Sequence, residues 1–238
     1  MKRIILPIVL LSVFFVSGCM YPQSELAKNQ VAVDEQVEMV QQAVMQYQEQ
    51  KDGLIPIKTK PSDAPLYEKY LIDFTMLKEA QLISEIPGTA YENGGFFQYI
   101  IITPEENPRV KLIDLRTTEK LREINFKLDI YRQQNIYPPF GEQVADGIFA
   151  LNYEKLGLKE EPTVVSPFSG QNLPILMTTE GKLIIDYRID LQLALEEFKP
   201  EVTEGEDIRY ILEDHYHFVP AYSVSYTMDG DKIVLHHE

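Results

Sequence analysis

The chain has 238 residues, of which 45% are hydrophobic, and a formal net charge of −15 at pH 7. This length suffices for one large domain or two small ones with real cores. The strongly acidic balance repels the phosphate backbone of nucleic acid and anionic lipid head groups, so we expect no nucleic-acid partner.

The first stretch, residues 1–19, has the layout of a bacterial lipoprotein signal. Lys2 and Arg3 give a basic start, and an apolar run from Ile4 to Val16 follows. A secretory signal needs this basic start, an apolar segment of about 7–15 residues and a small-residue cleavage site. The apolar run is shorter than the ~20 residues that span a bilayer. We therefore expect a cleaved signal, with a short membrane anchor as the alternative.

Cys19 directly follows small residues, Ser17 and Gly18, and is the only cysteine of the chain. We expect residues 1–18 to be removed and Cys19 to carry lipid, with an incidental cysteine as the alternative. Two or more acyl chains anchor a protein stably, whereas one holds it only marginally. The mature protein is therefore expected on the extracytoplasmic face of the cell membrane, with the membrane as its partner through Cys19. Residues 19–33 are polar with little periodicity and predict a flexible tether.

Residues 34–116 predict a first unit that consists of a helix, an extended segment, a short helix and a β-hairpin. The helix is indicated by an apolar stripe from Val37 to Tyr47 at helical spacing. Proline-rich sequence then favours an extended segment, and aromatic and β-branched runs favour strands. The predicted elements are a helix that starts with Asp34 as its N-cap, a short helix at 73–77 and strands at 96–103 and 109–115.

A second unit of the same order is predicted for residues 117–198, and residues 199–238 add a C-terminal loop and β-hairpin. The predicted elements are a helix at 121–131, a short helix at 151–156, strands at 174–178 and 182–187, a helix at 191–198 and a hairpin at 222–235. Together the two units predict an α+β protein of tandem similar units with a C-terminal helix-hairpin partial repeat.

Two Asp-x-Arg pairs recur at corresponding places, Asp114 with Arg116 and Asp186 with Arg188. Each pair lies where a predicted strand gives way to a helix. An acidic side chain and an arginine can satisfy exposed backbone groups there, so the recurrence indicates a structural role. The alternative is a pair of catalytic carboxylates, which requires both aspartates in one cleft with perturbed pKa values.

A candidate metal site lies near the C-terminus. If residues 213–217 form a strand, alternation places Glu213, His215 and His217 on one face. Two imidazoles and a carboxylate are suitable ligands for zinc or another divalent ion. The alternative is a solvated histidine pair beside acidic neighbours.

Other motifs that indicate catalysis are not found in the sequence. There is no Gly-x-Ser-x-Gly nucleophile motif, and the only cysteine is assigned to the lipid. There is no Gly-rich phosphate loop, so nucleotide binding is not supported. We therefore expect no cofactor and no nucleotide.

Several segments together resemble the YphF-type lipoproteins of Bacillus and its relatives. They are the cysteine-containing signal, EQVEMVQQAV, GLIPIKT, VKLIDLR, YPPF, VSPFSGQNLP and IDYR. The resemblance covers nearly the whole mature chain. It implies a membrane-anchored, extracytoplasmic location and supplies no catalytic residues.

The leading functional hypothesis is a non-enzymatic binding or scaffolding module of the cell envelope. Its partner is expected to be an envelope protein or a wall component. One alternative is a solute-binding lipoprotein that serves a transporter. A second alternative is a metal-binding hydrolase that uses His215 and His217.

Overall fold

The structure is a computed structural model that describes residues 23–61 and 64–236. The chain divides into two compact units, Met1–Gln36 and Val37–Glu238. Cys19 and the predicted signal lie outside the described residues. Helices and sheets are both present, so the expected α+β class is confirmed. Among the described helices, none has the length and apolarity needed to cross a bilayer.

The first described element, α2 (Gln23–Gln50), begins earlier than the sequence led us to expect. The predicted start at Asp34 is wrong, and residues 23–33, expected to be part of a flexible tether, are helical. The physical reason is that no glycine or proline interrupts this stretch, while residues such as Glu25, Ala27 and Lys28 have high helix propensity. Asp34 therefore lies inside a continuous helix.

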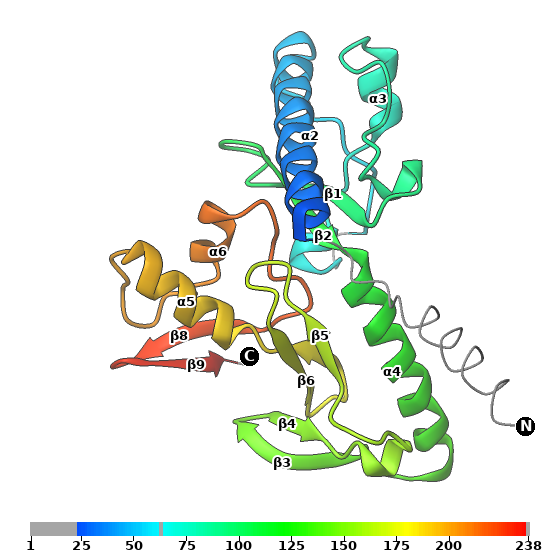
Figure 1. The fold of residues 1–238 in the computed structure, drawn as a ribbon, viewed down its shortest axis with the longest axis vertical. Coiled ribbons are helices and arrows are strands. Elements are labelled where there is room, and N and C mark those ends of the chain that lie inside the picture. Colours follow the sequence, from blue (N-terminus) through cyan, green and yellow to red (C-terminus); the bar gives the residue numbers. More distant parts are fainter. Residues whose placement is uncertain (1–22, 62–63, 237–238) are drawn as a thin grey trace, which may run out of the picture. The chain divides into compact units, whose positions relative to one another are not determined.

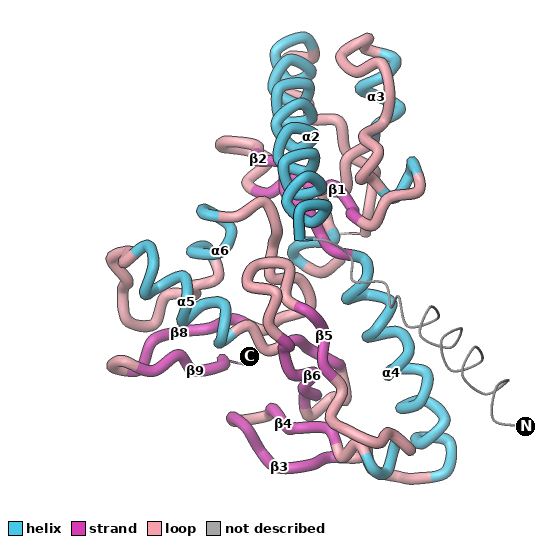
Figure 2. The backbone as a smooth tube through the Cα atoms, in the orientation of Figure 1, coloured by secondary structure: helices cyan, strands magenta, loops and turns pink. Residues whose placement is uncertain are grey.

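The remaining elements follow in chain order (Figure 1). Up to the first long helix they are η2 (Leu66–Glu68), α3 (Phe74–Glu79), η3 (Tyr91–Asn93), β1 (Phe97–Ile102), β2 (Arg109–Asp114) and α4 (Leu115–Gln134). Beyond it they are β3 (Phe140–Ala145), β4 (Ile148–Leu151), η4 (Glu154–Leu156), β5 (Thr163–Val165), β6 (Asn172–Thr178), β7 (Leu183–Ile185), α5 (Arg188–Phe198), α6 (Tyr210–His215), β8 (Ser225–Asp229) and β9 (Lys232–His236). Figure 2 shows how much loop connects them.

The first hairpin forms as predicted, with β1 and β2 antiparallel in a register from Phe97 opposite Asp114 to Ile102 opposite Arg109. A distant segment continues this sheet. The Leu112 amide donates to the His217 carbonyl at 2.8 Å, and the Val219 amide donates to the Leu112 carbonyl at 3.1 Å. Residues 217–219 thus run along β2 as a short parallel neighbour.

The second sheet is larger than the predicted hairpin. Its order is β3-β4-β6-β5, and β7 also pairs with β6. Only β6 and β7 correspond to predicted strands; β3, β4 and β5 were missed. One buried cluster joins α4, this sheet, α5, α6 and the β8–β9 hairpin. Residues 37–238 therefore form one compact unit, in which the boundary expected at 116/117 falls in the first turn of α4.

Gly95 lies where two stretches of backbone come very close. Its amide donates to the Ala90 carbonyl at 2.9 Å. A Cβ at this position would lie 2.1 Å from the Thr89 carbonyl oxygen. We expect Gly95→Ala to lower the free energy of unfolding by about 2 kcal/mol, because the backbone must move to relieve the overlap. Urea unfolding followed by circular dichroism measures this loss.

The neighbouring residue provides the control. Gly94 has a φ of +82°, but a Cβ there would meet nothing within 4 Å. Gly94→Ala should therefore lower the free energy of unfolding by about 1 kcal/mol, through backbone strain alone. Equal losses in the two variants would contradict a steric origin at Gly95.

Candidate functional site

The predicted Asp-x-Arg pairs lie at helix starts, as expected. Asp114 is the N-cap of α4, and its carboxylate accepts from the Arg116 amide at 2.9 Å and from the Arg116 guanidinium. Asp186 repeats this arrangement before α5, with the Arg188 amide at 3.1 Å. Each carboxylate is occupied by its own backbone and its own arginine. The structural interpretation of these pairs therefore accounts for their contacts.

A third pair of the same kind was missed. Asp207 and Arg209 stand before α6, and the Asp207 carboxylate accepts from the Arg209 amide at 3.2 Å. The guanidinium donates to the same carboxylate through Nε at 2.8 Å and through Nη2 at 2.6 Å. The Asp-x-Arg spacing at 207–209 is the sequence signal that could have revealed this pair.

Arg209 also lines a pocket of about 500 Å³ within the second compact unit. Its described lining combines apolar side chains, hydroxyl and amide groups, three basic residues and one acidic residue. The residues that line it are Pro65, Leu66, Tyr67, Glu68, Thr118, Leu121, Arg122, Asn125, Lys182, Leu183, Arg209, Ala221, Tyr222 and Ser223. They come from η2, α4, the β6–β7 turn and its following strand, and the segments that flank α6.

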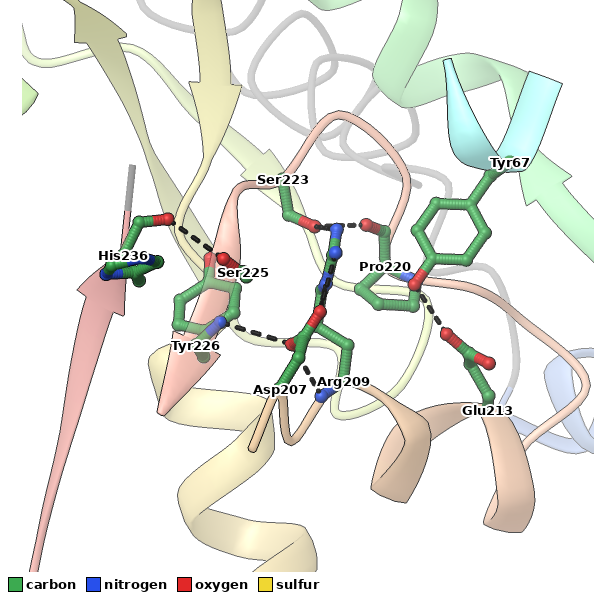
Figure 3. A network of polar contacts seen from close by, with 9 residues as sticks. All are labelled: Tyr67, Asp207, Arg209, Glu213, Pro220, Ser223, Ser225, Tyr226 and His236. Carbon is green, nitrogen blue, oxygen red and sulfur yellow. Dashed lines mark hydrogen bonds and ion pairs between the residues drawn. The ribbon is translucent and has the colours of Figure 1, made fainter. Parts of the chain in front are cut away.

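Arg209 is the most firmly held of the basic residues (Figure 3). Besides its contacts to Asp207, its Nη1 donates to the Ser223 hydroxyl at 3.2 Å, and its guanidinium lies 5.7 Å from the centre of the Tyr67 ring. Burial lowers the pKa of Arg209, but Asp207, Tyr67 and Glu213 raise it by more, so its pKa is raised overall. Arg209 is therefore a fixed positive charge in the pocket wall.

Tyr222 adds a hydroxyl in a strained backbone setting. Its φ is +59°, although it is not a glycine. Its hydroxyl lies 2.8 Å from the Thr118 hydroxyl, and its carbonyl accepts from the Ile185 amide at 2.8 Å. Burial raises the pKa of Tyr222, so the ring carries a neutral hydroxyl at physiological pH. Backbone strain of this kind is found preferentially at functional sites.

The other two basic residues, Arg122 on α4 and Lys182 in the β6–β7 turn, are exposed. Within the described part of the chain, neither takes part in an ion pair, in contrast to Arg209. Two long basic side chains at the surface of the pocket can thus reorient toward a bound group.

The predicted metal ligands are not brought together on one face. Residues 210–215 form helix α6 instead of a strand, because Ile211 and Leu212 are buried in the main core. Glu213 accepts a hydrogen bond of 2.5 Å from the Tyr67 hydroxyl. The His215 ring stacks on Phe198 with centroids 3.7 Å apart, and the His217 carbonyl accepts from β2.

The strand on which that metal hypothesis depended is therefore wrong. Among residues 23–61 and 64–236 no group of three or more histidine, cysteine, aspartate or glutamate side chains is arranged to hold a metal ion.

Comparison with known proteins identifies one segment. Residues 33–114 match the YphF family N-terminal domain, so the expected resemblance is confirmed over this part of the chain. The matched segment ends with β2 and contributes η2 to the pocket; the remaining pocket residues follow it. No curated protein and no solved structure matches the chain.

Proposed function

We propose that this chain, whose residues 33–114 form a YphF family N-terminal domain, is a non-enzymatic binding module of the cell envelope. In this proposal a lipid on Cys19 holds the protein at the extracytoplasmic face of the membrane, and the pocket around Arg209 is its binding site. The observation that carries the proposal is the pocket itself, in which Arg209, Thr118 and Tyr222 are already held by contacts within the protein.

The lining of the pocket favours binding over catalysis. Among the described residues that line it there is no histidine and no cysteine, and Glu68 is the one carboxylate. The two tyrosine hydroxyls are poor bases and nucleophiles, because burial raises the pKa of both Tyr67 and Tyr222. Neutral donors beside fixed charges orient a ligand but do not readily transfer its protons.

Anchoring is tested by Cys19→Ala in the full-length protein in its natural cells. We expect the unchanged chain in the membrane fraction with incorporated fatty acid, and the variant without fatty acid and at least tenfold depleted from membranes. A single unanchored acidic protein has little affinity for anionic lipid surfaces. Met20→Ala, beside the cysteine, is the matched control and should behave like the unchanged chain. Incorporation of fatty acid into Cys19→Ala, as in the unchanged chain, would refute the lipid anchor at this residue.

Binding is tested by photo-crosslinking in cells. A benzoylphenylalanine at the exposed pocket residue Asn125 should capture an envelope component, whereas the same group at the exposed residue Lys155, which does not line the pocket, should not. A recovered protein or wall fragment supports the binding module. The alternative is a solute-binding lipoprotein that delivers its ligand to a transporter. In that case the crosslinker should capture small molecules and a membrane permease instead.

A further inference from the structure

We propose that the pocket around Arg209 binds a sugar-sized ligand that carries an anionic group, either a phosphoryl group or a carboxylate. This inference rests on the proposed binding function and specifies the chemistry of its ligand. Three features support it: the balance of charge in the pocket, the mixture of its other side chains, and its size.

The charge of the pocket is opposite to that of the chain. The protein as a whole has a net charge of −15, but among the described residues the pocket is lined by Arg122, Lys182 and Arg209 against the carboxylate of Glu68. Arg209 is already paired with Asp207, so it supplies a positioned donor and little free charge. With Arg209 paired, the two positive charges of Arg122 and Lys182 face the one negative charge of Glu68, and this balance favours an anion.

The remaining lining suits a polar ring. Hydroxyl and amide groups of Thr118, Asn125 and Ser223 can donate and accept, as a sugar requires. Leu121 and Leu183 provide apolar surface beside them. Pockets of several hundred Å³ with apolar walls and a few placed polar groups are typical of small-molecule sites, and a volume of about 500 Å³ accommodates one sugar with its substituent.

The exposed position of Arg122 and Lys182 predicts how binding depends on salt. Charges in contact with solvent are screened over about 10 Å at 0.1 M ionic strength. The affinity for an anionic ligand should therefore fall as salt is raised, whereas the affinity for a neutral sugar should not.

The test titrates the full-length lipidated protein in detergent with glucose 1-phosphate, glucuronate, glucose and inorganic phosphate, using calorimetry. We expect both anionic sugars to bind at least tenfold more tightly than glucose and than inorganic phosphate. The double variant Arg122→Gln/Lys182→Gln should lose at least tenfold in affinity for the anionic sugars. Because both residues are exposed, its circular dichroism and melting temperature should be unchanged.

The double variant Lys155→Gln/Lys159→Gln is the matched control, since it removes the same charge at exposed residues that do not line the pocket. Its affinities should equal those of the unchanged protein. Equal affinity for glucose and the anionic sugars, no binding of any sugar, or no effect of Arg122→Gln/Lys182→Gln overturns the inference. If no sugar binds while crosslinking at Asn125 still captures an envelope component, the proposed ligand class is wrong but the proposed binding function is supported. If no sugar binds and crosslinking captures nothing, both proposals are wrong.

Discussion

Asp207→Ala is expected to lower the free energy of unfolding by about 3 kcal/mol. The change removes the partner of Arg209, whose side chain is only 15% exposed. A largely buried guanidinium without its carboxylate costs roughly 3–5 kcal/mol, and the partial exposure of Asp207 places the expected loss at the lower end of this range. The amide of Tyr226, which donates to the same carboxylate at 3.2 Å, also loses its acceptor.

The other two Asp-x-Arg pairs provide the controls for this prediction. Arg188 and Arg116 are 36% and 61% exposed, so water solvates their guanidinium groups when the aspartate is removed. Asp186→Ala and Asp114→Ala should therefore lower the free energy of unfolding by about 1–2 kcal/mol each, mainly because the backbone amide at each helix start loses its carboxylate acceptor. Denaturant unfolding of the three variants under the same conditions measures whether Asp207→Ala loses the most stability. Equal losses at the three positions would show that arginine burial does not govern the energy.

Lys111→Met is expected to stabilise the protein by about 2 kcal/mol at pH 7. Lys111 lies on β2, is 7% exposed, and donates to the Tyr216 carbonyl at 2.6 Å. Burial, with a smaller effect of Arg109, lowers its pKa to about 8, although Asp214 and Glu213 raise it. At ~1.4 kcal/mol per pH unit this charged group costs about 3 kcal/mol, of which ~1 is offset by the hydrogen bond that methionine cannot make.

The sign of the pH dependence follows from the lowered pKa. Between about pH 8 and 10 the unfolded chain keeps the proton on Lys111 while the folded chain has released it. The unfolded state thus binds more protons, and the stability of the unchanged protein rises over this range. The advantage of Lys111→Met should therefore shrink as pH rises from 8 to 10. Unfolding measured at several pH values tests this, with the same substitution at exposed Lys155 as a control that should not reproduce the effect.

Local patterns predicted the parts of the fold that depend on neighbouring residues. The β1–β2 hairpin, the short helix α3 and the β6–β7 pair all follow from periodicity and turn residues. Strands β3 and β5 were missed because each is a short segment with several polar or exposed residues. Their strand conformation depends on pairing with β4 and β6, which the local sequence does not reveal.

The sequence around His215 shows why α6 was misread. Alternation of Glu213, His215 and His217 suggested a strand, but the apolar residues Ile208, Ile211 and Leu212 have helical spacing and enter the core. The burial of these three apolar residues determines the helix, and the alternation of the polar residues does not. Only the continuation at residues 217–219 pairs with β2.

The pocket could not be predicted because its residues are far apart in the chain. Tyr67 and Tyr222 are brought to one site by long-range contacts such as that of Tyr67 with Glu213. Arg122 and Lys182, separately, look like ordinary surface residues on a helix and in a turn. The one local signal was the Asp-x-Arg spacing of Asp207 and Arg209, which was missed although it repeats the two recognised pairs.

The pairing of residues 217–219 with β2 has a consequence for how the chain matures. If the chain is exported with its N-terminus first, the edge of β2 emerges well before the segment that covers it. Before residues 217–219 pair with β2, the Leu112 amide and carbonyl have no backbone partner from this segment. An exposed strand edge can form hydrogen bonds with strands of other chains. A fragment that ended at Asp114, where the match to the YphF family N-terminal domain ends, would lack the segment that covers this edge. In the folded chain residues 217–219 cover this edge of the first sheet, and this pairing opposes aggregation through β2.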